Sequence, residues 1–270
     1  MNYIQTDVSD EALITAIRLN MCDFFRHTSK SNPAEHFANE QFTRWYTPLP
    51  HPWFNGVLSS NPPKDDADSF ISGTIKYFRD KGVNTFTWWM VPHQKPSDWE
   101  SALSKHGFGF SDDTPGMAVD LHTMKDSIQP ADGFEIRSVD DEESLRLWAK
   151  VFVNGYGLPP AWETITIDLW MQLGLDFPMH NYLGYLNGKP ISTSSVFYGG
   201  GAAGIYCVAS LPEARGKGIG AAITLKPLQD ALEMGYRIGV LQSSEMGFNV
   251  YKKLGFRHLC QIENFYLSLE

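Results

Sequence analysis

The clearest pattern of hydrophobic and polar positions lies in the second half of the chain. Short apolar runs predict strands at residues 134–139, 181–187, 191–199, 202–210, 237–242, 256–261 and 263–269. Longer amphipathic stretches predict helices over about 140–154, 161–174, from a glycine-rich loop to about Met234, and up to Leu254. The "GKP" and "GGG" segments suit hairpin turns. Together these elements predict an α/β fold, a mixed sheet with helices on its faces.

The chain also resembles itself. "VSDEALITAIRL" from Val8 is similar to "VDDEESLRLWAK" from Val139. "LSKHGFGFSDDTPGMAVDL" from Leu103 is similar to "YKKLGFRHLCQIENFYLSL" from Tyr251, so that the two matches occur in the same order. We therefore predict two copies of one unit. The polar segment 122–133 places their boundary between a domain at 1–128 and one at 129–270.

Composition narrows the class of protein. A 43% hydrophobic share is ample for sizeable cores, and the net charge of −9 argues against a nucleic-acid binder. Cys22, Cys207 and Cys260 are far apart and form no CxxC pair, which favours a reducing compartment. The eight His show no metal-ligand spacing, and no apolar run is long enough to span a bilayer. We expect a soluble, cytoplasmic protein without a metal site or membrane partner.

The segment "ARGKGIGA", residues 214–221, carries the candidate chemistry. One interpretation is a tight turn between a strand and a helix. A second is a dinucleotide fingerprint, because Gly216, Gly218 and Ala221 match G-x-G-x-x-A. We set it aside because "SLPEAR" separates the strand from the first glycine, and only about 50 residues remain for a doubly wound sheet.

A third interpretation is a cradle for the pyrophosphate of coenzyme A. Successive backbone amides at a helix N-terminus attract an anion, and glycines let it approach the backbone. Arg215 and Lys217 add positive charge beside the glycines.

This segment, within "VASLPEARGKGIGAAI", resembles motif A of the GNAT superfamily of acyl-CoA N-acyltransferases, and "SSEMGFNVYKKLGF" resembles its motif B. The resemblance is strong from about residue 180 to 267. It implies two tandem GNAT-like units, each a mixed, mostly antiparallel twisted sheet flanked by helices, with a degenerate first copy.

The resemblance also implies site residues. Tyr251 would donate a proton to the leaving thiolate of acetyl-CoA, a general-acid role. Cofactor-binding residues would be Cys207, Val208, Ala209, Arg215, Gly216, Lys217, Gly218, Ile219, Gly220, Ala221, Ser244 and Phe248. The side chain of Cys207 itself is expected to be packed rather than nucleophilic.

Several positions depart from the family pattern. Many members have Asn where this chain has Ser244 and Ala where it has Gly247, and Pro227 should bend the cofactor helix. No Glu stands on the strand before the loop, so the general base is left open among Glu245, Asp168, Glu163 and bulk water. The acceptor pocket would be formed by the helices after the first strand, with four candidate residues. These are Tyr156, Trp162, Glu163 and Asp168.

In the first copy the glycine loop is missing. Asp65, Asp66 and Asp68 stand where phosphates would lie, and Leu103 stands at the position of Tyr251. We predict that this copy is structural. The second copy would transfer acetyl from acetyl-CoA to a primary amine of a small molecule by direct attack, with a small cationic amine favoured by the acidic charge. The alternative is a catalytically inactive acyl-CoA-binding module.

Overall fold

The computed structural model describes residues 3–31, 34–39, 41–47, 52–59, 66–91, 98–125 and 128–269. The chain folds into two compact units, neither of which is continuous in sequence. We call them the C-terminal unit, residues 1–24 and 116–259, and the N-terminal unit, residues 25–115 and 260–270. These units do not coincide with halves divided at residue 128. That residues 1–128 and 129–270 are separate domains with separate roles stays a prediction.

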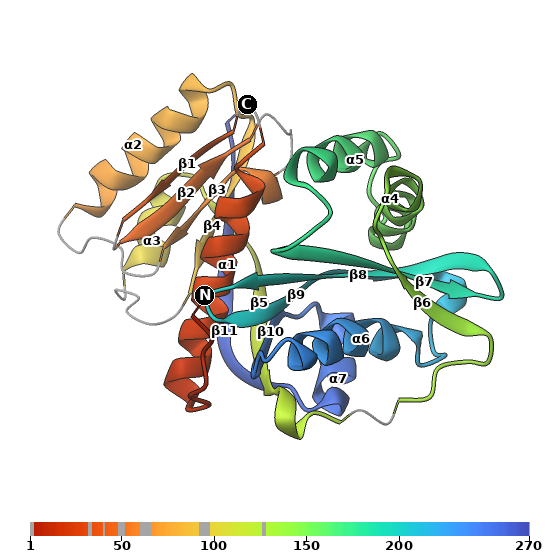
Figure 1. Cartoon of the computed structure of the whole chain (residues 1–270). Helices are drawn as coiled ribbons and strands as arrows, with labels where there is room; N and C mark the ends of the chain where they lie inside the picture. The colour runs from red at the N-terminus through yellow and green to blue at the C-terminus, as the bar shows by residue number, and fades with distance from the viewer. Residues whose placement is uncertain are drawn as a thin grey trace. The chain divides into compact units, whose positions relative to one another are not determined.

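The C-terminal unit is built on a sheet of order β5-β10-β9-β8-β7-β6. Its strands are the end of β5 (Gly109–Asp120), β6 (Phe134–Ser138), β7 (Met179–Leu186), β8 (Lys189–Gly199), β9 (Ala202–Ser210) and β10 (Ile238–Gln242). Among the described strand pairs of this sheet, β9 and β10 are parallel and the others are antiparallel. Figure 1 shows α4 (Glu142–Tyr156) and α5 (Trp162–Leu173) on one face of the β6–β9 region, and α6 (Ile219–Glu233) and α7 (Glu245–Leu254) on the other.

The N-terminal unit has the strand order β1-β2-β3-β4-β11. Its strands are β1 (Glu35–Ala38), β2 (Phe42–Tyr46), β3 (Gly56–Ser59), β4 (Thr85–Met90) and most of β11 (Arg257–Ser268). Its helices are α2 (Ala67–Asp80) and α3 (Trp99–Lys105). Aromatic side chains fill its core, among them the fully buried Trp88, Phe78 and Phe86. Most residues of β4 are buried.

The predicted internal repeat is visible in the structure. β5 and β11, at the ends of the two copies, are each 12 residues long. Each follows a short helix that ends in the same way: Phe108 N donates to Leu103 O, and Phe256 N donates to Tyr251 O, both at 3.1 Å. The two predicted strands 256–261 and 263–269 are one strand, β11, which runs through residue 262 without a turn.

The last strand of each copy pairs in the unit of the other copy. Residues 116–120 of β5 pair with β10, and residues 263–268 of β11 pair with β4. Local hydrophobic patterns predict that a strand exists but not which strand it joins, so this exchange could not be predicted from the sequence.

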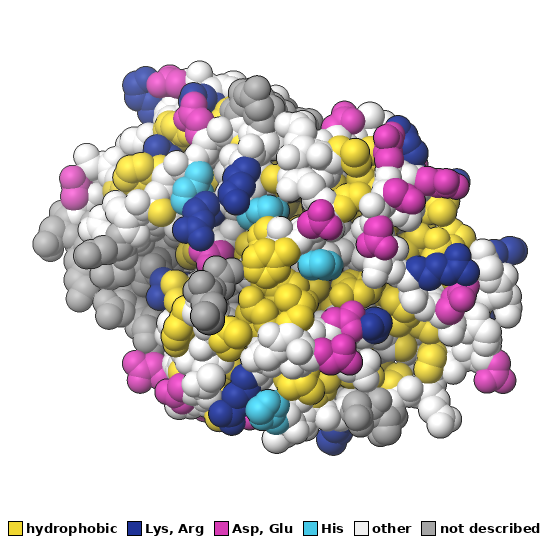
Figure 2. All heavy atoms as spheres, in the orientation of Figure 1, with side chains coloured by type: hydrophobic (Ala, Val, Ile, Leu, Met, Phe, Trp, Pro, Cys, Tyr) yellow, Lys and Arg dark blue, Asp and Glu magenta, His cyan; other side chains and the backbone are white. Residues whose placement is uncertain are grey.

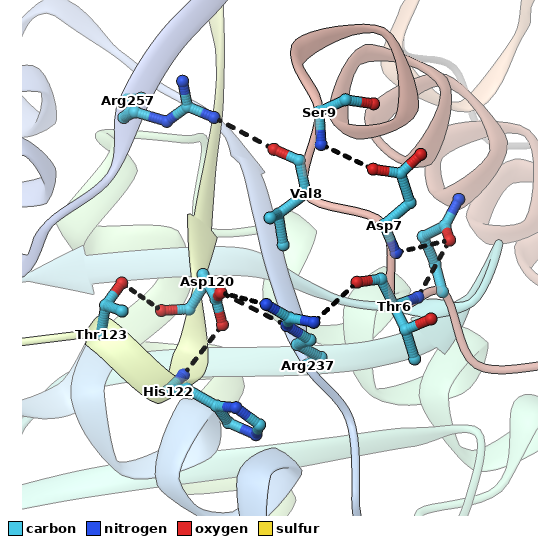
Figure 3. Close-up of polar contacts among 10 residues, drawn as sticks. Thr6, Asp7, Val8, Ser9, Asp120, His122, Thr123, Arg237 and Arg257 are labelled. Atoms are coloured by element: carbon cyan, nitrogen blue, oxygen red, sulfur yellow. Dashed lines mark hydrogen bonds and ion pairs between the residues drawn. The ribbon is translucent and has the colours of Figure 1, made fainter.

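The first residues of the chain also belong to the C-terminal unit. Arg237, just before β10, donates to Thr6 O at 2.9 Å and forms an ion pair with Asp120 at 2.9 Å (Figure 3). Arg257 reaches Val8 O at 3.5 Å. The first part of α1 (Asp10–Thr28) follows directly, so this unit includes a helix from the start of the chain.

Candidate active site

The site begins where two parallel strands separate. β9 and β10 pair from Ala203–Gly239 to Ile205–Leu241, and no further pair joins them although both are described throughout. β9 continues for five residues to Ser210, held on its other side by β8. The backbone edge of residues 206–210 that faces away from β8 is therefore open to pair with an extended ligand. This stretch includes Cys207, Val208 and Ala209, three of the predicted cofactor-binding residues.

A bulge shapes the same half-strand. Thr193 lies opposite Ala209 but Ser195 lies opposite Tyr206, so β9 contains one extra residue in between. Cys207 takes up the bulge with φ of +53°, in the left-handed region, and Thr193 Oγ1 donates to its carbonyl at 2.8 Å. A cysteine does not signal this conformation, and sequence analysis missed the bulge.

The side chain of Cys207 is a poor nucleophile. Burial raises its thiol pKa to about 12, so the thiol keeps its proton at neutral pH. This supports the expectation that the residue contributes its backbone rather than its sulfur.

The glycine loop leads into α6. Gly216 and Gly218 have φ of +74° and +73°, which favours glycine at both positions. The side chains of Arg215 and Lys217 are exposed beside them. Gly218 is the N-cap of α6 and no side chain caps the helix, so the first-turn amides that follow have no partner within the helix. Those amides belong to three predicted cofactor-binding residues, Ile219, Gly220 and Ala221.

The two glycines of the motif differ in what surrounds them. A β-carbon on Gly218 would lie 3.1 Å from Gln129 O and 3.3 Å from Pro130 Cα, because the segment before β6 passes over the loop. Ala131 N also donates to Lys217 O at 3.0 Å. A β-carbon on Gly220 would meet only Ser210 Oγ, at 3.9 Å, and Gly220 has no positive φ. Neither packing nor backbone strain requires glycine at 220, so the space beside it is available to a ligand.

Helix α6 runs continuously through Pro227, which is buried. Proline has no N–H for the carbonyl four residues earlier. Ser194 of β8 fills the gap: its hydroxyl donates to Ile223 O at 2.6 Å. The helix is therefore continuous, and the bend expected at Pro227 stays a prediction.

Tyr251 lies on α7 and is buried, with 8% of its surface exposed. Burial raises its pKa to about 12, so the phenol is neutral and can donate its proton. The ring lies back over Gly247 one turn earlier, where a β-carbon would be 2.6 Å from Tyr251 Cε2. The absence of a side chain at residue 247 thus leaves room for the phenol ring of Tyr251.

Two further predicted residues stand on the same helix. Ser244 is the N-cap of α7, and its Oγ accepts from Gly247 N at 3.2 Å. Phe248 packs against the hydrophobic core of the unit, with Lys252 5.6 Å from its ring centroid. These are structural roles, and cofactor contact by either side chain stays a prediction.

The acceptor-side residues lie on α4 and α5. Because Gly155 has no side chain, the end of α4 packs closely against β9. A β-carbon on Gly155 would be 2.8 Å from Ala209 Cβ. The next residue, Tyr156, is 43% exposed, yet burial raises its pKa, and Cys207 and Tyr251 add to the shift. These interactions place the Tyr156 phenol near Cys207 and Tyr251. Trp162 is buried, whereas Glu163 is half-buried and Asp168 is exposed, as is Glu245 on α7.

The N-terminal unit lacks the corresponding opening. Its parallel strands β3 and β4 pair from Gly56–Thr87 to the last residues of both, Ser59 and Met90. Asp68 in the first turn of α2 pairs with Lys105 at 2.7 Å and His106 at 2.9 Å, and Leu103 is fully buried. Asp65 lies outside the described residues. This copy has no separated strands to receive a cofactor in its described part.

Surface and composition add little chemistry. Figure 2 shows acidic and basic side chains interspersed over the visible face rather than one continuous basic surface. Among the described residues, no group of three or more His, Cys, Asp or Glu is placed to hold a metal ion. No helix in the described ranges is long and apolar enough to cross a membrane.

Comparison with known proteins agrees with this geometry. Residues 143–256 match the model of the "Acetyltransferase (GNAT) family". No curated protein matches the chain. A solved GCN5-related N-acetyltransferase from Kribbella flavida is 15% identical, with a TM-score of 0.70 over 94% of this chain and 96% of that one. A "Tandem GNAT protein from the clavulanic acid biosynthesis pathway" is 13% identical, with a TM-score of 0.62 over 99% of this chain and 97% of that one.

The fold is therefore that of a tandem GNAT protein, with two α/β units built on mixed, mostly antiparallel sheets. Residues 143–256 are a domain of the GNAT family of acetyltransferases, so acyl transfer is the class of reaction to which the site belongs.

Proposed function

We propose that the protein is an N-acetyltransferase that transfers acetyl from acetyl-CoA to a primary amine of a small molecule. The observation that carries the proposal is the open space at Gly220, at the start of a helix whose first amides are uncapped. A pyrophosphate fits such a place, because unpaired amides and the helix dipole favour an anion. The separated half of β9 supplies the backbone edge for the pantetheine arm.

Different residues of this chain would bind the cofactor and donate the proton. The loop 215–221 would hold the pyrophosphate, with Arg215 and Lys217 adding charge, and residues 207–209 would hold the arm. Acetyl-CoA supplies an activated thioester. Tyr251 keeps its proton at neutral pH and would donate it to the departing thiolate sulfur. With the Cys207 thiol also protonated, direct attack by the amine is favoured over an acyl-enzyme.

The acceptor would bind on the side of α4 and α5, against Tyr156 and Trp162. The net charge of −9 favours a small cationic amine of the polyamine, amino-sugar or amino-acid kind, and a peptide amine stays an alternative. Three free cysteines are in keeping with the proposed cytoplasmic location.

The test is acetyl transfer itself. Purified protein is incubated with acetyl-CoA and a panel of primary amines, thiol release is followed, and products are identified by mass spectrometry. We expect an N-acetylated amine and no mass increase on the protein. If the protein binds acetyl-CoA tightly but thiol is released no faster with any amine than without an amine, the inactive acyl-CoA-binding module is favoured instead.

A further inference from the structure

The glycines of the β8–β9 hairpin face the start of the chain, from Tyr3 to helix α1. Four of them, at 199, 200, 201 and 204, have no room for a side chain. A β-carbon on Gly200 would lie 2.6 Å from Asn20 N, and one on Gly204 would lie 2.0 Å from Asn20 Oδ1. The "GGG" segment therefore does more than turn the chain, because it lets α1 lie directly on the hairpin.

Asn20 is the centre of this contact and is fully buried. Its Nδ2 donates to the carbonyls of Phe197, Gly199 and Ala202 at 3.2, 2.9 and 3.2 Å. Its Oδ1 accepts from the hydroxyl of Tyr206 at 2.7 Å. One buried amide thus joins both strands of the hairpin to α1, and a low local dielectric strengthens such hydrogen bonds.

Tyr206 is the last residue of β9 before the bulge at Cys207. Its ring stacks on Phe24 of α1, with centroids 4.0 Å apart and planes at 6°. The side chain is thus fixed at both ends, its hydroxyl by Asn20 and its ring by Phe24. The backbone of the next residues is the edge that lies open beside β10.

We propose that α1 is part of the acyl-transfer site: Asn20 and Phe24 act through Tyr206 as positioning residues that hold the bulge of β9 in place to receive the cofactor. The inference rests on the proposed function for the identity of the ligand. It gives the start of the chain a specific role in a site whose other residues all lie beyond residue 150.

The structure supplies a conservative variant and a matched control. Asn20→Ala removes four hydrogen bonds at once and leaves carbonyls unsatisfied, whereas Tyr206→Phe removes one and keeps the stacked ring. Tyr182→Phe is the control, since Tyr182 is another tyrosine of the same sheet and its hydroxyl donates to Asp230 of α6 at 2.8 Å, not to Asn20.

Two readouts are measured on the full-length protein. One is the Kd for acetyl-CoA by calorimetry; the other is the alkylation rate of Cys207 without ligand, resolved by peptide mass mapping. We expect Tyr206→Phe to weaken acetyl-CoA binding about 10-fold, the size of one lost buried hydrogen bond. We also expect Cys207 to react several-fold faster, because the bulge is less firmly held. Tyr182→Phe should change neither readout.

The results separate this inference from the proposed function. If Tyr206→Phe and Tyr182→Phe have equal Kd values for acetyl-CoA and equal alkylation rates of Cys207, the positioning role of Tyr206 is wrong. Cys207 could also react faster only in Tyr206→Phe although the protein does not bind acetyl-CoA. In that case Tyr206 positions the bulge, but acetyl-CoA is not the ligand and the proposed function is wrong.

Discussion

The phenol ring of Tyr251 lies across Gly247, so close that a β-carbon on Gly247 would be 2.6 Å from Cε2 and 3.3 Å from the hydroxyl oxygen. Side chains on a helix point toward its N-terminus, which brings residues four apart together. The glycine lowers the stability of the helix, but it leaves room for the ring of Tyr251, the proposed proton donor.

Gly247→Ala tests this relationship. Alanine is the better helix former by about 1 kcal/mol, so the helix itself should gain stability. The ring must nevertheless move, and we expect kcat to fall at least several-fold. Gly73→Ala in α2 is the control, because no atom lies within 4 Å of the added carbon and activity should be unchanged. Full activity in Gly247→Ala would show that the position of the ring does not matter.

Tyr251→Phe removes the proton donor and keeps the ring. We expect kcat to fall by about 10²–10⁴-fold, the usual contribution of a general acid, with the Kd for acetyl-CoA nearly unchanged. Equal losses in kcat and affinity would mean that the residue only shapes the cofactor site. Steady-state kinetics and calorimetry together distinguish the two.

The pH dependence has a definite sign. The pKa of Tyr251 is raised to about 12 in the folded protein, above the value near 10 of an unfolded chain. The acid stays protonated until pH approaches 12, so its ionisation should not lower kcat below pH 10. Between pH 10 and 12 the unfolded chain loses this proton and the folded chain keeps it, so stability should fall as pH rises. An alkaline limb of kcat near pH 9 that disappears in Tyr251→Phe would contradict this assignment.

Gly216 and Gly218 form a matched pair. Alanine at either position should cost about 1–2 kcal/mol, because both have a left-handed φ. Only at Gly218 does the added carbon also meet the segment at Gln129 and Pro130. Gly218→Ala should therefore lower the free energy of unfolding more than Gly216→Ala. Urea denaturation measures the difference. Equal losses of unfolding free energy would show that the segment at Gln129 and Pro130 moves aside without an energetic penalty.

Ser194 and Pro227 are expected to be coupled. Ser194→Ala leaves Ile223 O buried without the donor that replaces the missing N–H, which should cost about 1–3 kcal/mol. In a Pro227→Ala background the helix supplies that N–H, and the same change should cost less. A double-mutant cycle on unfolding free energies checks the coupling. Additive effects would mean that the serine does not compensate for the proline.

The sequence predicted most of the C-terminal fold and the residues of the loop. Glycines at left-handed positions, a tyrosine followed by Gly-Phe and amphipathic helices are local features, and local features can be recognised in one sequence. Gly216 and Gly218 therefore lie in the loop before a helix, and Tyr251 lies on the last helix, while their roles at the site stay predictions.

The missing parts depend on contacts between distant segments. Nothing around Asn20 predicts that its amide will bond three carbonyls more than 170 residues away. Cys207 is not a residue type that signals a left-handed bulge. The exchange of β5 and β11 leaves no local mark, because a strand has the same alternation whichever neighbour it joins.

The most direct test of the account is a calorimetric titration of acetyl-CoA into the wild-type protein and into Gly220→Glu, with NADH as the control ligand. The added side chain at 220 enters open space, so the fold should be kept, as thermal unfolding will verify, while its carboxylate repels a pyrophosphate. We predict that the wild type binds acetyl-CoA and not NADH, and that the variant binds neither. Absence of acetyl-CoA binding by the wild type, or equal binding by the variant, would contradict the assignment of the glycine loop as the cofactor site.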